Sequence, residues 1–334
     1  MPEDLFVSLE AILPLIVLTA WVCALLLVDL FIPKERKGLT ALIAAIGLLV
    51  TLGFVIARIG RPIVGFGGMI FADNFANFLN VLILVSGLAG IALAHDYLKR
   101  IGLERGEYYS LLLFSMIGMM LMGMTADLIV VFLALELLSI PLYVLAGIAT
   151  PRLSSEEAGL KYFLLGAFAS GFVLFGTALV YGATSYTGLA DIVASVSSGA
   201  ANLTWLLVGA ARILIGLGFK VAVVPFHMWT PDVYEGAPTP VAAFFASAPK
   251  VAAMVLMTRV VIGAMGSAID AWQQIIIFLA LTSIILGAVG AIDAVGAIDT
   301  VDAVDAVDAV DAVDAVDAIG TVGAFGAAAA AAGA

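Results

Sequence analysis

The chain alternates between long apolar stretches and short segments rich in glycine, proline and charged residues. A membrane-spanning helix needs about 20 mostly apolar residues. Nine stretches approach or exceed this length, and they predict spans at residues 8–31, 39–57, 75–95, 108–124, 127–149, 159–182, 203–226, 239–262 and 271–292. Because turn-forming segments separate these stretches, the pattern predicts an all-α, polytopic transmembrane helical bundle.

The composition supports this interpretation. Hydrophobic residues make up 63% of the 334 positions, charged residues only 12%, and the mean hydropathy is +1.19. Soluble domains carry about a quarter of their residues as charges. The composition therefore excludes a water-soluble protein, a nucleic-acid-binding protein and a disordered chain.

Basic residues gather in alternate loops, which predicts the orientation of the chain. The loops on one side contain Lys34, Arg36, Lys37, Lys99, Arg100, Arg105 and Arg152. The opposite loops contain only Arg58 and Arg61. Since lysine and arginine are enriched in cytoplasmic loops, we expect these loops to face the cytoplasm and the N-terminus to face outward.

The last 42 residues differ from the rest. Residues 301–318 repeat Val-Asp-Ala without interruption, and residues 293–334 hold eight of the 25 acidic residues. Residues 1–292 therefore carry 17 acids against 14 bases, so most of the net charge of −11 belongs to this tail. A three-residue period spreads the aspartates around a helix instead of forming one polar stripe. We interpret residues 293–334 as a solvated, low-complexity segment without a functional signal.

Three ionisable residues stand out deep within predicted spans, where charge is costly. These are Glu136, Lys220 and Lys250. Each opposes membrane insertion by roughly 2.5–3.5 kcal/mol at a helix centre. Intramembrane charges of this kind usually serve ion or proton transport and face a partner charge or water.

Prolines accompany all three charges. Pro141 and Pro225 each follow a charged residue by five positions, and Pro249 directly precedes Lys250. Proline removes a backbone hydrogen bond and kinks a helix, which frees carbonyl groups. A kinked helix beside a buried charge favours a proton path near the middle of the membrane. The alternative is a static Glu–Lys pair that only fixes helix packing.

Three further residues are secondary candidates. Lys161 either reaches the membrane surface or extends the row of charges inward. Arg212 precedes Lys220 by two turns and has either a structural role or a place in an outward path. His227 follows Pro225 and either admits protons or caps a helix end.

Residues that would hold a redox cofactor are scarce. Cys23 is the only cysteine, and the two histidines lie far apart, so we expect no iron–sulfur cluster or metal site. No glycine-rich phosphate-binding loop is present. We therefore expect this chain to bind no cofactor.

Three segments resemble a known family. They are DLIVVFLALELLSIPLYVLAG at 127–147, GLKYFLLGAFASG at 159–171 and GFKVAVVPFHMWTPDVYEGAPTPVAAFFASAPK at 218–250. They resemble the N subunits of NADH-quinone oxidoreductase, respiratory complex I, which belong to the antiporter-like, proton-pumping membrane proteins. The resemblance implies partner subunits that hold NADH, flavin, iron–sulfur clusters and quinone. It also implies contacts with other complex I membrane subunits and with lipid, in a bacterial inner membrane where the outward-facing N-terminus is periplasmic.

The resemblance also implies residue roles. Glu136 corresponds to the family's acidic residue on the fifth helix, Lys220 to the lysine on the broken seventh, and Lys250 to the lysine on the eighth. The family has roughly fourteen helices in two inverted repeats, of which this chain matches about nine. We expect N-terminal helices at 1–125, proton-translocating helices at 126–262, the start of a second repeat at 263–292, and the tail.

The expected function is proton transport by a complex I subunit, coupled to quinone reduction in other subunits. We consider two alternatives. One is a subunit of a multisubunit sodium/proton antiporter, which shares the fold. The other is a membrane scaffold that joins neighbouring subunits without transporting ions.

Overall fold

The computed structural model describes residues 2–33, 36–265 and 269–298, and these residues are almost entirely helical. Lys34 and residues 299–334 of the predicted tail lie outside this part. The helices are α1 (Pro2–Ala11), α2 (Leu13–Asp29), α3 (Gly38–Ile56), α4 (Asn74–Arg100), α5 (Gly106–Met124), α6 (Leu128–Ala146), α7 (Leu153–Thr184), α8 (Leu189–Ser197), α9 (Leu203–Val221), α10 (Thr230–Gly236), α11 (Thr239–Ala246), α12 (Ala248–Met265) and α13 (Ile269–Ile298).

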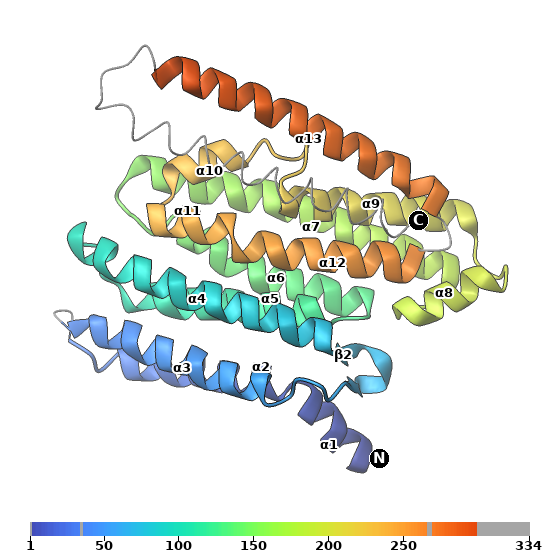
Figure 1. Cartoon of the computed structure of the whole chain (residues 1–334), viewed down its shortest axis with the longest axis horizontal. Coiled ribbons are helices and arrows are strands. Elements are labelled where there is room, and N and C mark those ends of the chain that lie inside the picture. The colour runs from blue at the N-terminus through green and yellow to red at the C-terminus, as the bar shows by residue number, and fades with distance from the viewer. Residues whose placement is uncertain (1, 34–35, 266–268, 299–334) are drawn as a thin grey trace.

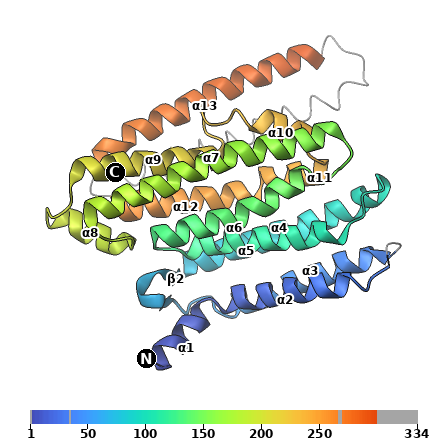
Figure 2. The ribbon, with the colours of Figure 1, turned by 180° about the vertical axis from the view of Figure 1, so that it is seen from behind.

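The described helices confirm a polytopic membrane bundle. Eight spans within them are long and apolar enough to cross a membrane, and the bent pair α1–α2 counts as a ninth if taken as one span. The α2–α3 hairpin forms one flank, α13 forms the opposite flank, and the other long helices run between them (Figures 1 and 2). Helix α5 is the most buried of the spans and packs against α2, α4, α6 and α12.

The first span is not the single helix predicted over residues 8–31. Helices α1 and α2 meet at Ile12 with a bend of 64° between them. Pro14 lies in the first turn of α2, where backbone N–H groups have no partner within the helix, so the missing N–H of proline costs no hydrogen bond. Arg58 supports the bend because its guanidinium donates a 3.2 Å hydrogen bond to the carbonyl of Ala11, at the end of α1.

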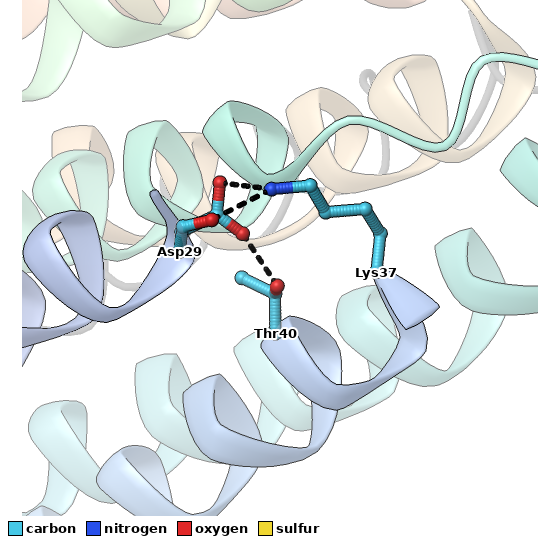
Figure 3. Close-up of polar contacts among 3 residues, drawn as sticks. All are labelled: Asp29, Lys37 and Thr40. Carbon is cyan, nitrogen blue, oxygen red and sulfur yellow. Dashed lines mark hydrogen bonds and ion pairs between the residues drawn. The ribbon is translucent and has the colours of Figure 1, made fainter. Parts of the chain in front are cut away.

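A buried carboxylate closes the turn between α2 and α3. Asp29 pairs with the ammonium of Lys37 at 2.6 Å and accepts a 2.5 Å hydrogen bond from Thr40 (Figure 3). A Cβ atom on Gly106, at the start of α5, would lie 2.0 Å from an Asp29 oxygen. The α2–α3 turn is thus held by polar contacts and packs directly on α5.

A small hairpin interrupts the helices between α3 and α4. Strands β1 (Ile63–Gly65) and β2 (Ile70–Ala72) are antiparallel, in a segment predicted only as a turn. Asp73 follows β2 and caps α4 by accepting the N–H of Ala76 at 2.7 Å. The same carboxylate pairs with Arg259 of α12 at 2.7 Å. This end of α12 is therefore tied to the start of α4.

Two predicted spans are broken, but not at their prolines. The predicted span 203–226 is present, but helix α9 ends at Val221, five residues before the predicted end, and Pro225 lies in the connection to α10. The predicted helix 239–262 is divided at Ser247 into α11 and α12, and Pro249 lies in the first turn of α12. Helix α6 continues through Pro141. Two of the three predicted kink prolines thus follow a helix end instead of bending a helix.

The last described helix is longer than predicted. Helix α13 reaches Ile298, whereas the predicted span ended at residue 292. The additional residues include two alanines, and alanine has the highest helix propensity. The first residues assigned to the tail therefore continue the helix.

Candidate functional site

Lys220 is buried where α9 stops. It lies in the last turn of α9 and is 4% exposed. Ala222 then adopts a left-handed conformation, with φ 64° and ψ 37°, and its N–H bonds to carbonyls of the last turn. A lysine near a helix C-terminus is favoured by the partial negative charge of that end. The break thus places a cation in the interior beside the carbonyl end of its own helix.

Two tyrosines flank the ammonium of Lys220. Its Nζ lies 5.5 Å from the ring centroid of Tyr143 on α6 and 5.2 Å from that of Tyr162 on α7. The same Nζ donates a 3.3 Å hydrogen bond to the hydroxyl of Tyr162. A desolvated cation–π contact stabilises a cation by about 2 kcal/mol. Aromatic rings and one hydroxyl therefore surround the buried charge.

The tyrosine pair belongs to a larger aromatic cluster. Trp229, just before α10, stacks on Tyr162 with centroids 4.6 Å apart and an interplanar angle of 11°. Its indole N–H donates a 2.9 Å hydrogen bond to the carbonyl of Phe219, the neighbour of Lys220. Tyr143 meets Tyr162 edge-on at 4.8 Å. These contacts link α6, α7, α9 and the start of α10 around one lysine.

The aromatic cluster extends to the second buried lysine. Lys250, in the first turn of α12, is 1% exposed, and its Nζ lies 5.1 Å from the ring of Tyr234 on α10. Tyr234 meets Trp229 edge-on, with centroids 6.2 Å apart. Three stacked or edge-on rings, those of Tyr162, Trp229 and Tyr234, thus connect the surroundings of the two lysines.

Glu136 acts on Lys220 through space and forms no described ion pair with it. It is half-buried on α6, two turns before Tyr143, and it acts electrostatically on both Lys220 and Tyr143. Among the ion pairs of the described residues, none joins Glu136 to Lys220. One carboxylate oxygen of Glu136 is buried and has no hydrogen-bond partner in the described part of the chain.

The packing of α7 against α9 brings Lys220 to Tyr162. Gly176 and Gly209 let the two backbones approach, since a Cβ on Gly176 would lie 2.7 Å from the carbonyl oxygen of Gly209. Small residues at such crossings allow close approach of transmembrane helices. Gly166 makes room in the same way for Tyr143, whose hydroxyl would lie 2.1 Å from an added Cβ.

The secondary candidates lie apart from this cluster. Lys161 is 41% exposed and pairs with Glu157 at 2.7 Å and with Asp232 at 2.6 Å. Its position is consistent with the surface alternative, although its role stays a prediction.

Arg212 and His227 also lie outside the aromatic cluster. The guanidinium of Arg212 lies 4.5 Å from the ring of Phe175 and 6.0 Å from that of Phe172, both on α7. His227 is partly buried in the connection between α9 and α10, and its carbonyl accepts the N–H of Thr230.

The aromatic residues of the site were not predicted from the sequence. Tyr143, Tyr162 and Tyr234 were not singled out, and neither was Trp229. A signal did exist, because Tyr143 and Tyr162 each place a hydroxyl inside an apolar span. Buried tyrosine hydroxyls usually find a hydrogen-bond partner. Across the part of the chain that the structure describes, no group of three or more His, Cys, Asp or Glu residues is arranged to hold a metal ion.

Comparison with known proteins identifies the family. Residues 125–296 match the family described as NADH:quinone oxidoreductase/Mrp antiporter, TM, and this range contains Glu136, Lys220 and Lys250. The NADH-quinone oxidoreductase subunit N of Chloroflexus aggregans is 48% identical over 295 residues, which is 85% of this chain and 59% of that protein. The subunit N of Sphingopyxis alaskensis is 47% identical over 84% of this chain and 58% of its own length. The chain thus spans less than two thirds of these curated relatives.

Solved structures share the fold. A chain of respiratory complex I from Thermus thermophilus with bound aureothin is 31% identical, with a TM-score of 0.72 over 96% of this chain and 64% of that one. A chain of the Mrp complex from Dietzia sp. DQ12-45-1b is 22% identical, with a TM-score of 0.69 over 85% of this chain and 54% of its own, and it supports the fold alone. Since the family match covers more than half of the chain and includes Glu136, Lys220 and Lys250, the chain belongs to the NADH:quinone oxidoreductase/Mrp antiporter transmembrane family.

Proposed function

We propose that this chain is a subunit-N-type component of a proton-pumping NADH-quinone oxidoreductase in a bacterial inner membrane. Its relatives at 47–48% identity are N subunits of that enzyme. The proposal assigns NADH, flavin, iron–sulfur clusters and quinone to partner subunits. It retains the N-terminus on the periplasmic side and contacts with other membrane subunits of the complex and with lipid.

One observation carries the proposal. Lys220 and Lys250 are both buried at helix breaks, at the end of α9 and at the start of α12. A membrane protein keeps two such costly cations in its interior when they serve transport. A scaffold that only joined neighbours would be more stable with apolar residues at both positions.

The geometry favours Glu136 as the residue that controls Lys220. The two residues interact through space without a direct ion pair. Neutralising Glu136 removes an attraction that stabilises the charged form of Lys220. If quinone reduction in other subunits neutralises Glu136, Lys220 would therefore release its proton. Lys250 is the next buried residue along α10 and α12 that can accept a proton.

The test uses Glu136→Gln and Lys220→Ala in the assembled complex, reconstituted into vesicles. We expect both variants to assemble and to pump fewer protons per NADH oxidised. Lys99→Ala, which removes an exposed lysine near the end of α4, is the control and pumps normally. Unchanged pumping by both site variants would contradict the assigned roles.

The same vesicles separate the alternatives. Sodium-dependent proton exchange without NADH or quinone would favour the antiporter. Loss of assembly, with normal pumping by the complexes that remain, would favour the scaffold.

A further inference from the structure

Lys220 has an unusual hydrogen-bond partner for a buried cation. Within the described part of the chain, its hydrogen bond goes to the hydroxyl of Tyr162, at 3.3 Å, and not to a carboxylate. A carboxylate only accepts hydrogen bonds, so it favours the charged form of a lysine over the neutral form. A phenol hydroxyl both accepts and donates. Tyr162 can therefore bond to Lys220 in either protonation state.

The hydroxyl is held in place by its ring. Tyr162 is 2% exposed, is stacked on Trp229 at 4.6 Å and is met edge-on by Tyr143 at 4.8 Å. Trp229 is in turn fixed by its 2.9 Å hydrogen bond to Phe219, next to Lys220 in sequence. Tyr162 and Trp229 are therefore both linked to the end of α9, and any movement of the Tyr162 ring away from Lys220 disrupts its stacking on Trp229.

We propose that Tyr162 is a positioning residue that orients the ammonium of Lys220 for proton transfer and keeps the neutral amine in the same place afterwards. The proposal rests on the proposed function of Lys220. When the ammonium gives its proton to a water molecule, the N–H bond breaks, the electron pair stays on Nζ, and the water becomes hydronium. The Tyr162 hydroxyl, which accepted a hydrogen bond before, rotates and donates one to that electron pair. Tyr162 neither gains nor loses a proton in this step.

Tyr143 provides a matched control. Its ring lies 5.5 Å from the Lys220 ammonium, against 5.2 Å for Tyr162, and both rings are buried. Among the described hydrogen bonds to Lys220, however, only Tyr162 contributes a hydroxyl. Tyr→Phe at either position preserves the ring and the cation–π contact, and only at Tyr162 does it remove a hydrogen bond from the lysine.

The experiment compares Tyr162→Phe, Tyr143→Phe and Lys220→Ala in the assembled complex in vesicles. The Lys220-dependent share of pumping is the difference between the unaltered complex and Lys220→Ala, at equal NADH oxidation. We expect Tyr162→Phe to reduce this share about tenfold, because a hydrogen bond to a charged group is worth at least that factor in an equilibrium. The pH at which pumping is half-maximal also changes in Tyr162→Phe. Tyr143→Phe retains the hydrogen bond from Lys220 to Tyr162, so we expect it to reduce this share by a smaller factor than Tyr162→Phe and to shift the pH profile less.

The outcomes separate this inference from the proposed function. Normal pumping by Lys220→Ala would contradict the transport role that the proposed function gives to Lys220. If Lys220→Ala abolishes its share while Tyr162→Phe pumps normally, the role of Tyr162 alone is wrong. Equal losses in both Tyr→Phe variants would indicate a general sensitivity of the aromatic packing, and would also overturn the role. A thermal unfolding midpoint for each variant in detergent establishes that the bundle is intact.

Discussion

Val224 donates its backbone N–H to the hydroxyl of Ser283 on α13, with 3.0 Å between nitrogen and oxygen. Val224 lies in the non-helical connection after α9, three residues beyond the end of that helix. A backbone N–H in a membrane interior needs a partner, because no bulk water is available there. The helix at the edge of the bundle thus supports the break that places Lys220.

Ser283→Ala should therefore destabilise this connection. Leaving a buried donor unsatisfied costs about 1–3 kcal/mol, and we expect the free energy of unfolding in mixed detergent to fall by about that amount. Hydrogen exchange at the amide of Val224 should accelerate at the same time. Thr282→Val is the control, since the Thr282 hydroxyl bonds to carbonyls of its own helix. An unchanged exchange rate at Val224 in Ser283→Ala would show that this hydrogen bond does not support the break.

The crossing of α7 and α9 should be sensitive to one added methyl group. In Gly176→Ala, the new Cβ would lie 2.7 Å from the carbonyl oxygen of Gly209 and 2.9 Å from the backbone nitrogen of Ile213. These are backbone atoms, so the helices must separate, and overpacking of this kind costs about 1–3 kcal/mol. We expect that loss in the free energy of unfolding, together with weaker pumping, because Lys220 moves relative to Tyr162.

Gly171 provides the comparison on the same helix. A Cβ at Gly171 meets no atom within 4 Å, so Gly171→Ala should be neutral, or stabilising by up to about 1 kcal/mol through helix propensity. If the two alanine variants unfold with the same free energy, close approach of α7 and α9 does not determine the stability of this region.

The contacts of Asp29 predict that substitutions at two threonines of α3 lower the free energy of unfolding by different amounts. Thr40→Val keeps the side-chain shape but removes the 2.5 Å hydrogen bond to the buried carboxylate. Hydrogen bonds to charged groups contribute about 1.5–3 kcal/mol, and we expect a loss of that size in the free energy of unfolding. Thr51→Val is the matched control, because the buried Thr51 hydroxyl bonds only to the carbonyl of Gly47, within its own helix. It should cost less than 1 kcal/mol, and an equal cost at both sites would contradict a special role for Asp29.

The spans and the buried charges could be predicted from the sequence because both depend on local properties. The length of an apolar stretch decides whether it can cross a membrane, and eight or nine of the predicted spans are present among the described helices. The free energy needed to insert a charged residue into the membrane depends on where the residue lies within such a stretch. Lys220 and Lys250 could therefore be identified from their place in the apolar stretches, and both are buried.

The helix breaks could not be located from the sequence. Pro225 and Pro249 indicated irregular backbone, but α9 ends at Val221 and α11 ends at Ala246. Proline shows that a helix is disturbed nearby. Where the chain leaves the helix depends on which exposed N–H groups find partners, and Val224 finds its partner on α13, 59 residues away.

The surroundings of Lys220 were decided only by the tertiary structure. Glu136 acts on Lys220 only through space, whereas the hydrogen bond of Lys220 goes to Tyr162. The sequence by itself determined that a costly cation lies inside an apolar span, since hydrophobicity and charge belong to each residue. Its partner comes from another helix, 58 positions away, and became its neighbour because Gly176 and Gly209 let α7 and α9 approach closely.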